Sequence, residues 1–345
     1  MVPTDNQPQP RKRATMADVA ALVGVTKTTV SRYINKRSYV SPATAKKIEA
    51  AMRELDFTPN RIAKALSQQH TNVVIYVIHG NLLHVAQDPG LNTHYASAGL
   101  ELARHGYQIL SMTVDSEISI NQLKRLITER FADGYLFSPN HDDDPLLQIF
   151  ADSGVPVVTA GNWNAQADMM RAVDSDNCAA MKTMGEYLIH HGRSHIAYVA
   201  GPQDNAFSCE RINGLRDACS KAGIAAPSIF HLAAWNGDDL DAVWSQIEPI
   251  LPSLDAIAAA NDIIAANIIQ RLQARAYRVP EDIAVTGFDN TPIAANNKPP
   301  ITTIDQHLDQ HGTMMADVLM TMIDNEPVPD SVIYVPTELV IRESA

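Results

Sequence analysis

From residue 71 onward, short apolar runs alternate with stretches of helical periodicity, and this alternation restricts the fold more than any other feature of the sequence. The clearest run, residues 73–78, is continuously apolar, which is typical of a strand buried on both faces of a parallel sheet. Strands that alternate with helices predict doubly wound parallel α/β sheets. Because the alternation begins anew after residue 191, we expect two lobes, with a ligand bound between them at the carboxyl ends of the strands. The further apolar runs are residues 107–110, 134–137, 155–158, 195–199, 229–232, 256–260 and 283–287.

Residues 15–58 have a different pattern, three short helices with a glycine turn between the first two. Thr15 can cap the first helix, and Asp18 stands three residues later, which is the spacing of a capping box. Gly24 permits a left-handed turn, and Thr26 can cap the second helix. Two helices joined by a glycine turn and supported by a third predict an all-α helix-turn-helix headpiece.

The charge of the chain is unevenly distributed. The whole sequence carries a net charge of −12, yet residues 1–70 hold twelve Lys and Arg against five Asp and Glu. The remaining residues hold fifteen Lys and Arg against thirty-four Asp and Glu. A basic headpiece on an acidic body indicates that the headpiece binds a polyanion and that the body does not.

Several classes of protein are disfavoured by missing motifs. No apolar run approaches the roughly 18 residues of a membrane span, and the polar N-terminus lacks the apolar segment of a secretory signal. The cysteines Cys178, Cys209 and Cys219 form no CxxC motif, which fits a reduced compartment. P-loop, G-x-G-x-x-G, G-x-S-x-G and H-E-x-x-H motifs are all missing. We therefore expect a cytoplasmic protein that is not an enzyme and needs neither a cofactor nor a metal.

A known pattern runs through residues 15–67 without a gap. It is carried by Asp18-Val19-Ala20, Gly24-Val25, Thr29-Val30-Ser31-Arg32, Asn35, Val40-Ser41, Pro59-Asn60-Arg61 and Ala65-Leu66. Through these residues the stretch resembles the headpiece of the lactose-repressor (LacI/GalR) family. The first residues of a recognition helix reach base edges in the major groove. By the resemblance the base readers are Lys27, Thr28 and Arg32, and the phosphate contacts are Thr15, Thr26, Thr29, Ser31 and Asn35. For Thr26, helix capping is the alternative role.

The resemblance continues into residues 59–70, whose helical pattern is too short to be stable alone in water. It implies a hinge that orders only on operator DNA, with Asn60 and Arg61 at the DNA. Leu66 would insert into the minor groove and kink the duplex, and packing of Leu66 on the next helix is the alternative. We expect residues 1–14 to be a disordered basic arm.

Residues 71–345 resemble the periplasmic-sugar-binding-protein-like core of the same family, in which the chain crosses between the lobes three times. We place these crossings near residues 192, 306 and 327. Lobe 1 then comprises about residues 71–192 and 307–327, and lobe 2 about residues 193–306 and 328–345. This core is expected to bind the effector and to dimerise.

The resemblance also implies effector-binding residues in the cleft. Arg211 and Asp262 match a cation and a carboxylate that bind vicinal hydroxyls of a sugar, and Trp235 is the candidate platform for its ring face. Asp176 matches a further cleft position, for which Asp174 is a competing assignment. The alternatives are a surface charge for Arg211, an N-cap for Asp262 and a core position for Trp235.

The resemblance implies two further effector residues, and the sequence departs from the family at one place in the first lobe. Asp289 lies in a Gly-Phe-Asp corner that matches the family, and Gln306 lies at the crossing near residue 306, beside the cleft. In the first lobe, His79-Gly80-Asn81-Leu82-Leu83 replaces the proline and the Asn-Pro-Phe that usually follow the first strand. This departure leaves open what the first lobe offers to a ligand.

Together these features predict a sequence-specific repressor that binds double-stranded, palindromic operator DNA as a homodimer. A sugar or sugar derivative would release it by changing the geometry of the lobes and the order of the hinges. Because residues 339–345 show no heptad pattern, a dimer is favoured over a tetramer. The alternatives are a corepressor-dependent regulator of the purine type, an activator and, from another class, a sugar-binding protein without a role on DNA.

Overall fold

The computed structural model describes residues 14–35, 39–58, 70–80, 88–139, 141–163 and 169–345. The chain divides into two compact units, Met1–Thr71 and Asn72–Ala345. Most of the predicted arm, the hinge residues Asn60, Arg61 and Leu66, and positions 81–83 lie outside the described residues, as does the side chain of Asn35.

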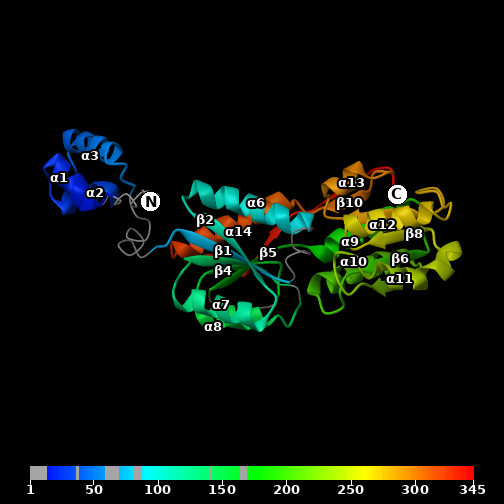
Figure 1. The fold of residues 1–345 in the computed structure, drawn as a ribbon. Helices are drawn as coiled ribbons and strands as arrows, with labels where there is room; N and C mark the ends of the chain where they lie inside the picture. Colours follow the sequence, from blue (N-terminus) through cyan, green and yellow to red (C-terminus); the bar gives the residue numbers. More distant parts are fainter. Residues whose placement is uncertain (1–13, 36–38, 59–69, 81–87, 140, 164–168) are drawn as a thin grey trace, which may run out of the picture. The chain divides into compact units, whose positions relative to one another are not determined.

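The described residues of the first unit form three helices, α1 (Met16–Val23), α2 (Lys27–Asn35) and α3 (Pro42–Glu54) (Figure 1). The predicted capping box is confirmed: the Asp18 amide donates to the Thr15 hydroxyl, and the Thr15 amide donates to the Asp18 carboxylate at 2.7 Å. Gly24 ends α1 with a φ of 72°, a left-handed conformation that favours glycine. Thr26 caps α2, since its hydroxyl accepts from the Thr29 amide at 3.2 Å.

A small apolar core holds these helices together. Val19 of α1, Val30 of α2 and Ile48 of α3 are fully buried in it. The Tyr33 phenol donates to Glu49 at 2.5 Å and joins α2 to α3. The buried side of α2 is thereby fixed, and its polar side is left on the surface.

The second unit contains two six-stranded sheets, each forming the centre of one lobe. The sheet of lobe 1 has the strand order β11-β5-β4-β3-β1-β2, and all of its pairs are parallel. Helices α6 (Pro89–Arg104) and α14 (Leu308–Ile323) cover one face, and α7 (Glu117–Thr128) and α8 (Pro145–Ser153) cover the other (Figure 1). The strands are β1 (Val73–His79), β2 (Gln108–Val114), β3 (Gly134–Ser138), β4 (Val157–Ala160), β5 (Met170–Ser175) and β11 (Val332–Val335).

Strand β1 explains the longest apolar run of the sequence. Val74, Tyr76 and Ile78 belong to the core under α6 and α14, whereas Ile75 and Val77 belong to the core under α7 and α8. Successive side chains of a strand point to opposite faces, so a strand covered on both faces is apolar throughout.

The sheet of lobe 2 has the strand order β12-β10-β9-β8-β6-β7, and only β12 is antiparallel to its neighbour among the described strands. The predicted doubly wound α/β core is therefore confirmed. No helix among the described residues is long and apolar enough to cross a membrane. The strands are β6 (Ile196–Ala200), β7 (Ser228–His231), β8 (Ala256–Ala259), β9 (Ala284–Phe288), β10 (Thr302–Asp305) and β12 (Glu338–Val340). The helices are α9 (Asn177–His190), α10 (Ala206–Ala222), α11 (Leu240–Ile247), η1 (Glu248–Ser253), α12 (Asp262–Gln273) and α13 (Pro292–Asn296).

Two of the three predicted crossings between the lobes are wrong. Helix α9 packs on α10 and contributes Met181 and Met184 to the core of lobe 2, so the first crossing lies between β5 and α9 and not near residue 192. Strand β11 pairs with β5 in lobe 1, so the last crossing lies between β11 and β12 and not near residue 327. The middle crossing joins β10 to α14, at residues 306–307.

Candidate functional site

The surface of α2 carries the predicted base-reading residues. Lys27, Thr28 and Arg32 are exposed, and the four-residue spacing of Thr28 and Arg32 places them on one face of the helix. Val30 is fully buried on the other side. Cationic and hydroxyl side chains at the exposed start of a helix suit the acceptor atoms of guanine and of phosphate.

The hydroxyls predicted to contact phosphates differ in what they can still donate. Thr15 donates its hydroxyl to Asp18 at 2.8 Å, so it has no proton left for a phosphate in this arrangement. The hydroxyls of Thr26 and Thr29 lie 2.9 Å apart, and whichever one donates leaves the other with a proton to offer. Ser31 is partly buried on α2.

A cavity of about 360 Å³ lies between the lobes of the second unit, at the carboxyl ends of the parallel strands of both sheets. Five of the six predicted effector residues line it: Arg211, Trp235, Asp262, Asp289 and Gln306. Residues that the sequence analysis did not single out also line it, among them Asp88, His94, Ser138, Asn177, Asn205, Phe207, Asn261 and His311.

Arg211 on α10 is held in place at the cavity by several contacts. It is only 5% exposed, which contradicts the alternative of a surface charge. Its Nε donates to Asn177 and its Nη1 to the carbonyl of Ala260, both at 2.8 Å. The guanidinium lies 3.6 Å from the ring centroid of Phe288 and 5.6 Å from that of Trp235. Its Nη2 has no partner among the described residues, so its two protons can be donated into the cavity.

Trp235 follows β7 and presents its indole beside Arg211. A Cβ atom at Gly201 would meet this ring at 2.6 Å, so the close approach of the indole to the end of β6 requires glycine there. The indole packs against the core of lobe 2 and also lines the cavity. A core position, predicted as the alternative role of Trp235, is therefore compatible with a place at the cavity.

Asp262 is fully buried at the start of α12. It is not the N-cap, because Asn261 caps this helix by accepting from the Ile264 amide at 2.9 Å. One Asp262 oxygen accepts from Thr303 at 2.6 Å, and the other accepts from the amide and the hydroxyl of Thr291. Burial raises the pKa of this carboxyl to about 6, against the opposing effect of these hydrogen bonds. Much of its acceptor capacity is thus used by the protein itself.

Asp289 and Gln306 form a pair at the ends of β9 and β10. The Gln306 amide donates to Asp289 at 2.6 Å, and Asp289 has a left-handed backbone with a φ of 100°. Burial raises the pKa of Asp289 to about 7, although the nearby Arg211 opposes the shift.

Asp176, predicted to bind the effector, does not line the cavity, whereas the competing Asp174 does. Asp176 is exposed, caps α9 by accepting from the Ala179 amide at 2.8 Å and does not line the cavity. Asp174 is buried at the end of β5 and accepts from the amides of Asn162 and Ser175. Burial raises its pKa to about 6.

Lobe 1 contributes a second polar wall. His79, at the end of β1, bonds through Nδ1 to the buried Asp144 at 2.7 Å, and this bond raises the pKa of the imidazole. Asp88 caps α6 by accepting from the amides of Gly90 and Leu91, and burial raises its pKa. The Asp-Pro pair that starts α6 is a helix-start signal that the sequence analysis did not use.

The charges around the cavity are mostly negative or neutral. Among the described lining residues, Arg211 is the one Lys or Arg side chain, whereas Asp88, Asp174, Asp262 and Asp289 are carboxyls. A phosphate or carboxylate group of a ligand would lie near these carboxyls, and no second Lys or Arg among the described lining residues would balance its charge. The cavity therefore suits an uncharged ligand with many hydroxyls better than an anionic one.

At one edge of the cavity, side chains of the two lobes are in contact. His141 pairs with Asp204 at 2.7 Å. The ring of Phe207 on α10 meets Trp163, with ring centroids 4.9 Å apart. Gly161 makes room for this contact, because a Cβ atom there would lie 1.9 Å from the Phe207 ring. These groups tie lobe 1 to the start of α10, the helix that carries Arg211.

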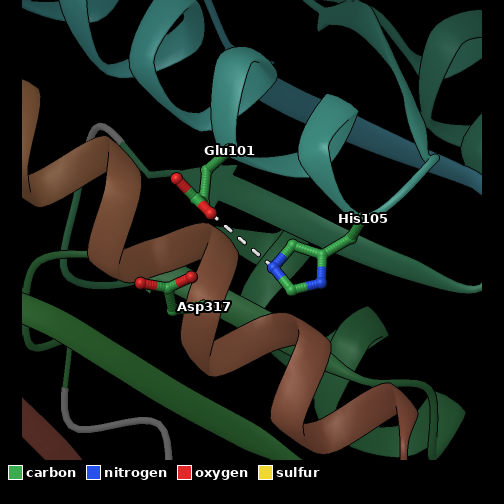
Figure 2. Close-up of side chains that lie close together, drawn as sticks. All are labelled: Glu101, His105 and Asp317. Carbon is green, nitrogen blue, oxygen red and sulfur yellow. Dashed lines mark ion pairs between the residues drawn. The ribbon is translucent and has the colours of Figure 1, made fainter.

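A separate polar cluster lies where α6 packs on α14. Figure 2 shows Glu101 of α6 and His105, the C-cap of that helix, close to Asp317 of α14. One carboxylate oxygen or ring nitrogen of each lies within 4.8 Å of the others. Glu101 also pairs with Arg104, and burial together with Glu101 raises the pKa of Asp317. We interpret the cluster as a polar contact outside the cavity, because Glu101 already has an ion-pair partner in Arg104.

Comparison with known proteins finds a family match in each of the two units. Residues 15–60 match the model of bacterial regulatory proteins of the lacI family, and residues 186–345 match a periplasmic binding protein-like domain. The HTH-type transcriptional regulator CelR of Thermobifida fusca is 33% identical over 336 residues, which cover 97% of this chain and 99% of that protein. The chain belongs to the LacI family. It is a DNA-binding transcriptional regulator with a small-molecule effector.

Other members of the LacI family are similar over the same length. The ribose operon repressor of Escherichia coli is 28% identical and covers 96% of this chain and 100% of its own. A CelR–cellobiose complex superimposes with a TM-score of 0.74 at 32% identity, covering 96% of this chain and 100% of that structure. The lac repressor dimer bound to operator and an anti-inducer has a TM-score of 0.82, covering 96% of this chain and 99% of its own. At 23% identity the last comparison shows the fold alone.

Proposed function

We propose that this chain is a repressor that binds a palindromic operator as a homodimer and is released by an uncharged oligosaccharide of the cellobiose class. It acts by binding and catalyses no reaction. The observation that carries the effector assignment is the cavity itself, in which the free edge of Arg211 and the Trp235 indole face a predominantly acidic wall. Support also comes from the CelR–cellobiose complex, which is similar along nearly the whole chain.

The proposed DNA interface is the start of α2. Lys27 and Thr28 would reach base edges, with Arg32 on the same helix. The hydroxyls of Thr26 and Thr29 share one proton in their mutual hydrogen bond, and the other proton would be donated to a phosphate. Ser31, Asn35 and the hinge residues Asn60, Arg61 and Leu66 complete the proposed contacts. Thr15 is assigned to capping, because its proton is donated to Asp18.

The proposed effector contacts differ in chemistry. Arg211 would donate to ligand hydroxyls through Nη2, and Trp235 would stack on an apolar ring face. Asp262 and Asp289 would accept from hydroxyls with the lone pairs that Thr303, Thr291 and Gln306 leave free. Asp174 replaces Asp176 in this set.

The test begins with the full-length protein and a random duplex library, from which bound sequences are selected and read. A two-fold symmetric site is expected to be enriched, and binding to it should weaken when cellobiose is added. Absence of an enriched palindrome would contradict the DNA assignment. Release by glucose 6-phosphate but not by cellobiose would contradict the uncharged-ligand assignment.

The sense of the response is tested by the same titration. Purine-type repressors are among the relatives, one being 31% identical over 339 residues, so hypoxanthine belongs in the ligand panel. Stronger operator binding in the presence of a ligand would identify a corepressor-dependent regulator in place of an inducible one.

A further inference from the structure

Two stacked histidines form part of the lobe 1 wall. His94 of α6 and His311 of α14 lie with their ring centroids 5.5 Å apart and their planes at 20°. Both line the cavity. The stacking depends on close contact of the two helices at Gly312, where a Cβ atom would lie 2.1 Å from the Ser97 hydroxyl and 2.4 Å from the carbonyl of His94.

The two rings differ in their hydrogen bonding. His311 is 4% exposed, and its Nε2 lies 2.9 Å from the Ser175 hydroxyl, so it has a partner in the fold. Both ring nitrogens of His94 are buried and have no partner among the described residues. Burial lowers the pKa of His94 to about 4, so the ring is neutral near pH 7 and has one donor and one acceptor.

A buried polar group without a partner destabilises a fold, and such groups are rare in native proteins. At His94 the unpaired nitrogens belong to a side chain that lines a ligand cavity. A ligand hydroxyl both donates and accepts, so it can match either nitrogen of a neutral imidazole. An anionic ligand group would in addition lie near the carboxyls that line the cavity.

We propose that His94 is a specificity-determining contact of lobe 1, where its neutral imidazole hydrogen-bonds a hydroxyl of an uncharged, polyhydroxylated effector. His311 positions the His94 ring by stacking on it. Because Arg211 and Trp235 belong to lobe 2, a ligand that reaches His94 as well would connect the two lobes. This inference rests on the proposed function.

The test compares four full-length variants by calorimetric titration with cellobiose. His94→Leu removes both polar atoms while keeping a similar volume, and we expect affinity to fall about tenfold. His94→Asn and His94→Gln each return an amide near one of the two nitrogens, so one of them should recover most of the loss. His105→Leu is the matched control, since His105 is the C-cap of the same helix, exposed and outside the cavity. The affinity of this variant should equal that of the wild type.

A second measurement needs no ligand. If His94 is unpaired in the free protein, His94→Leu should melt at the wild-type temperature or above it, because a buried polar group without a partner is removed. A lowered melting temperature for His94→Leu would overturn the inference, since it would show that the ring stabilises the fold. Wild-type cellobiose affinity in His94→Leu would overturn it as well. If the wild type fails to bind cellobiose, the proposed effector class fails, and the melting comparison still decides the state of His94.

Discussion

At the scale of single residues, the headpiece permits a direct test of base reading. Lys27 is exposed at the start of α2 and makes no contribution to the headpiece core. Lys27→Ala should weaken binding to the selected operator by about 1–3 kcal/mol and reduce discrimination between bases at one position of each half-site. Fluorescence anisotropy with single-base operator variants measures both effects.

The matched control for this prediction is Arg53→Ala. Arg53 lies exposed on α3, and its contact to Glu49 is a surface ion pair of little energetic value. Its removal should lower the affinity for all sequences equally or leave it unchanged. Equal losses for Lys27→Ala on every operator variant would mean that Lys27 contacts only the backbone.

Arg211 and Asp176 make a second pair of residue tests. Arg211→Ala should abolish the response to effector, and it should lower the free energy of unfolding by about 1–3 kcal/mol because Asn177 and the Ala260 carbonyl lose a buried donor.

Asp176→Asn should change neither the response to effector nor the free energy of unfolding, since asparagine also caps helices and the side chain is outside the cavity. A loss of effector binding in Asp176→Asn would restore the original assignment of Asp176.

The raised pKa of Asp289 makes stability depend on pH. Its folded value of about 7 lies above the ordinary value of 3.8, so the folded state holds the proton more tightly than the unfolded state does. The stabilisation that comes from the protonated Asp289 carboxyl is complete below about pH 4 and is lost as the pH rises through 7. Between pH 6 and pH 8 the wild type should lose on the order of 1 kcal/mol.

Urea unfolding of the second unit at several pH values measures this loss, and Asp289→Asn should flatten the profile between pH 6 and pH 8. Asp262 and Asp174 titrate near pH 6 in the folded state and contribute to the slope below that pH. His94 and His311 have the opposite effect on stability, because burial keeps both rings neutral in the folded state. Below about pH 6.5 they make the free energy of unfolding fall as the pH falls. A profile unchanged by Asp289→Asn would contradict the assignment of the slope to this carboxyl.

At the scale of elements, helix packing in lobe 2 depends on one glycine. A Cβ atom at Gly214 of α10 would lie 2.1 Å from the carbonyl oxygen of Cys178 on α9, and backbone atoms cannot move aside cheaply. Gly214→Ala should therefore destabilise the second unit by about 1–3 kcal/mol. It should also disturb effector binding, since Arg211 lies on the same helix.

Thermal unfolding with Gly99→Ala as the control separates packing from helix propensity. Gly99 lies inside α6, where a new Cβ atom would meet only the end of the Ile109 side chain at 3.0 Å. Alanine is more favourable in a helix than glycine by about 1 kcal/mol. This gain should offset the cost of the contact with Ile109, so the stability of Gly99→Ala should be close to that of the wild type. Equal destabilisation of both variants would argue against a specific contact between α9 and α10.

Elements were predictable from the sequence where the pattern was local. Strand β1 is apolar along its whole length, and α1 and α3 begin with capping residues at the expected spacing. Strand β5 was missed because Met170–Ser175 ends in two polar residues, of which Asp174 lines the cavity. The lobe of β11 was assigned wrongly because it depends on pairing with β5, which is more than 150 residues away and leaves no local signal.

The site shows the same limit. Arg211 was found through the resemblance to the family, whereas its burial and its bonds to Asn177 and Ala260 come from distant elements. His94 is one histidine on a helix, and nothing in its neighbours distinguishes it from a solvent-exposed one. Its significance arises only from the packing of α6 on α14.

At the scale of the whole molecule, the two units should respond differently to salt. The basic headpiece replaces counterions on DNA, so operator affinity should fall at least tenfold between 50 and 200 mM salt, on the order expected for several phosphate contacts. An uncharged effector displaces no counterions, so cellobiose affinity should change less than about twofold. Titrations at four salt concentrations measure both. A parallel fall in effector affinity would indicate an anionic ligand.

The contact of Phe207 with Trp163 also has an optical consequence. The chain has three tryptophans, and each occupies a different place in the second unit: Trp163 between the lobes, Trp235 at the cavity, and Trp244 buried inside lobe 2. Indole emission depends on the polarity and mobility of its surroundings. The protein thus contains its own fluorescent probes: Trp235 for occupancy, Trp163 for separation of the lobes and Trp244 as an internal reference. Replacing each in turn with phenylalanine would let binding and lobe movement be timed separately in one stopped-flow experiment.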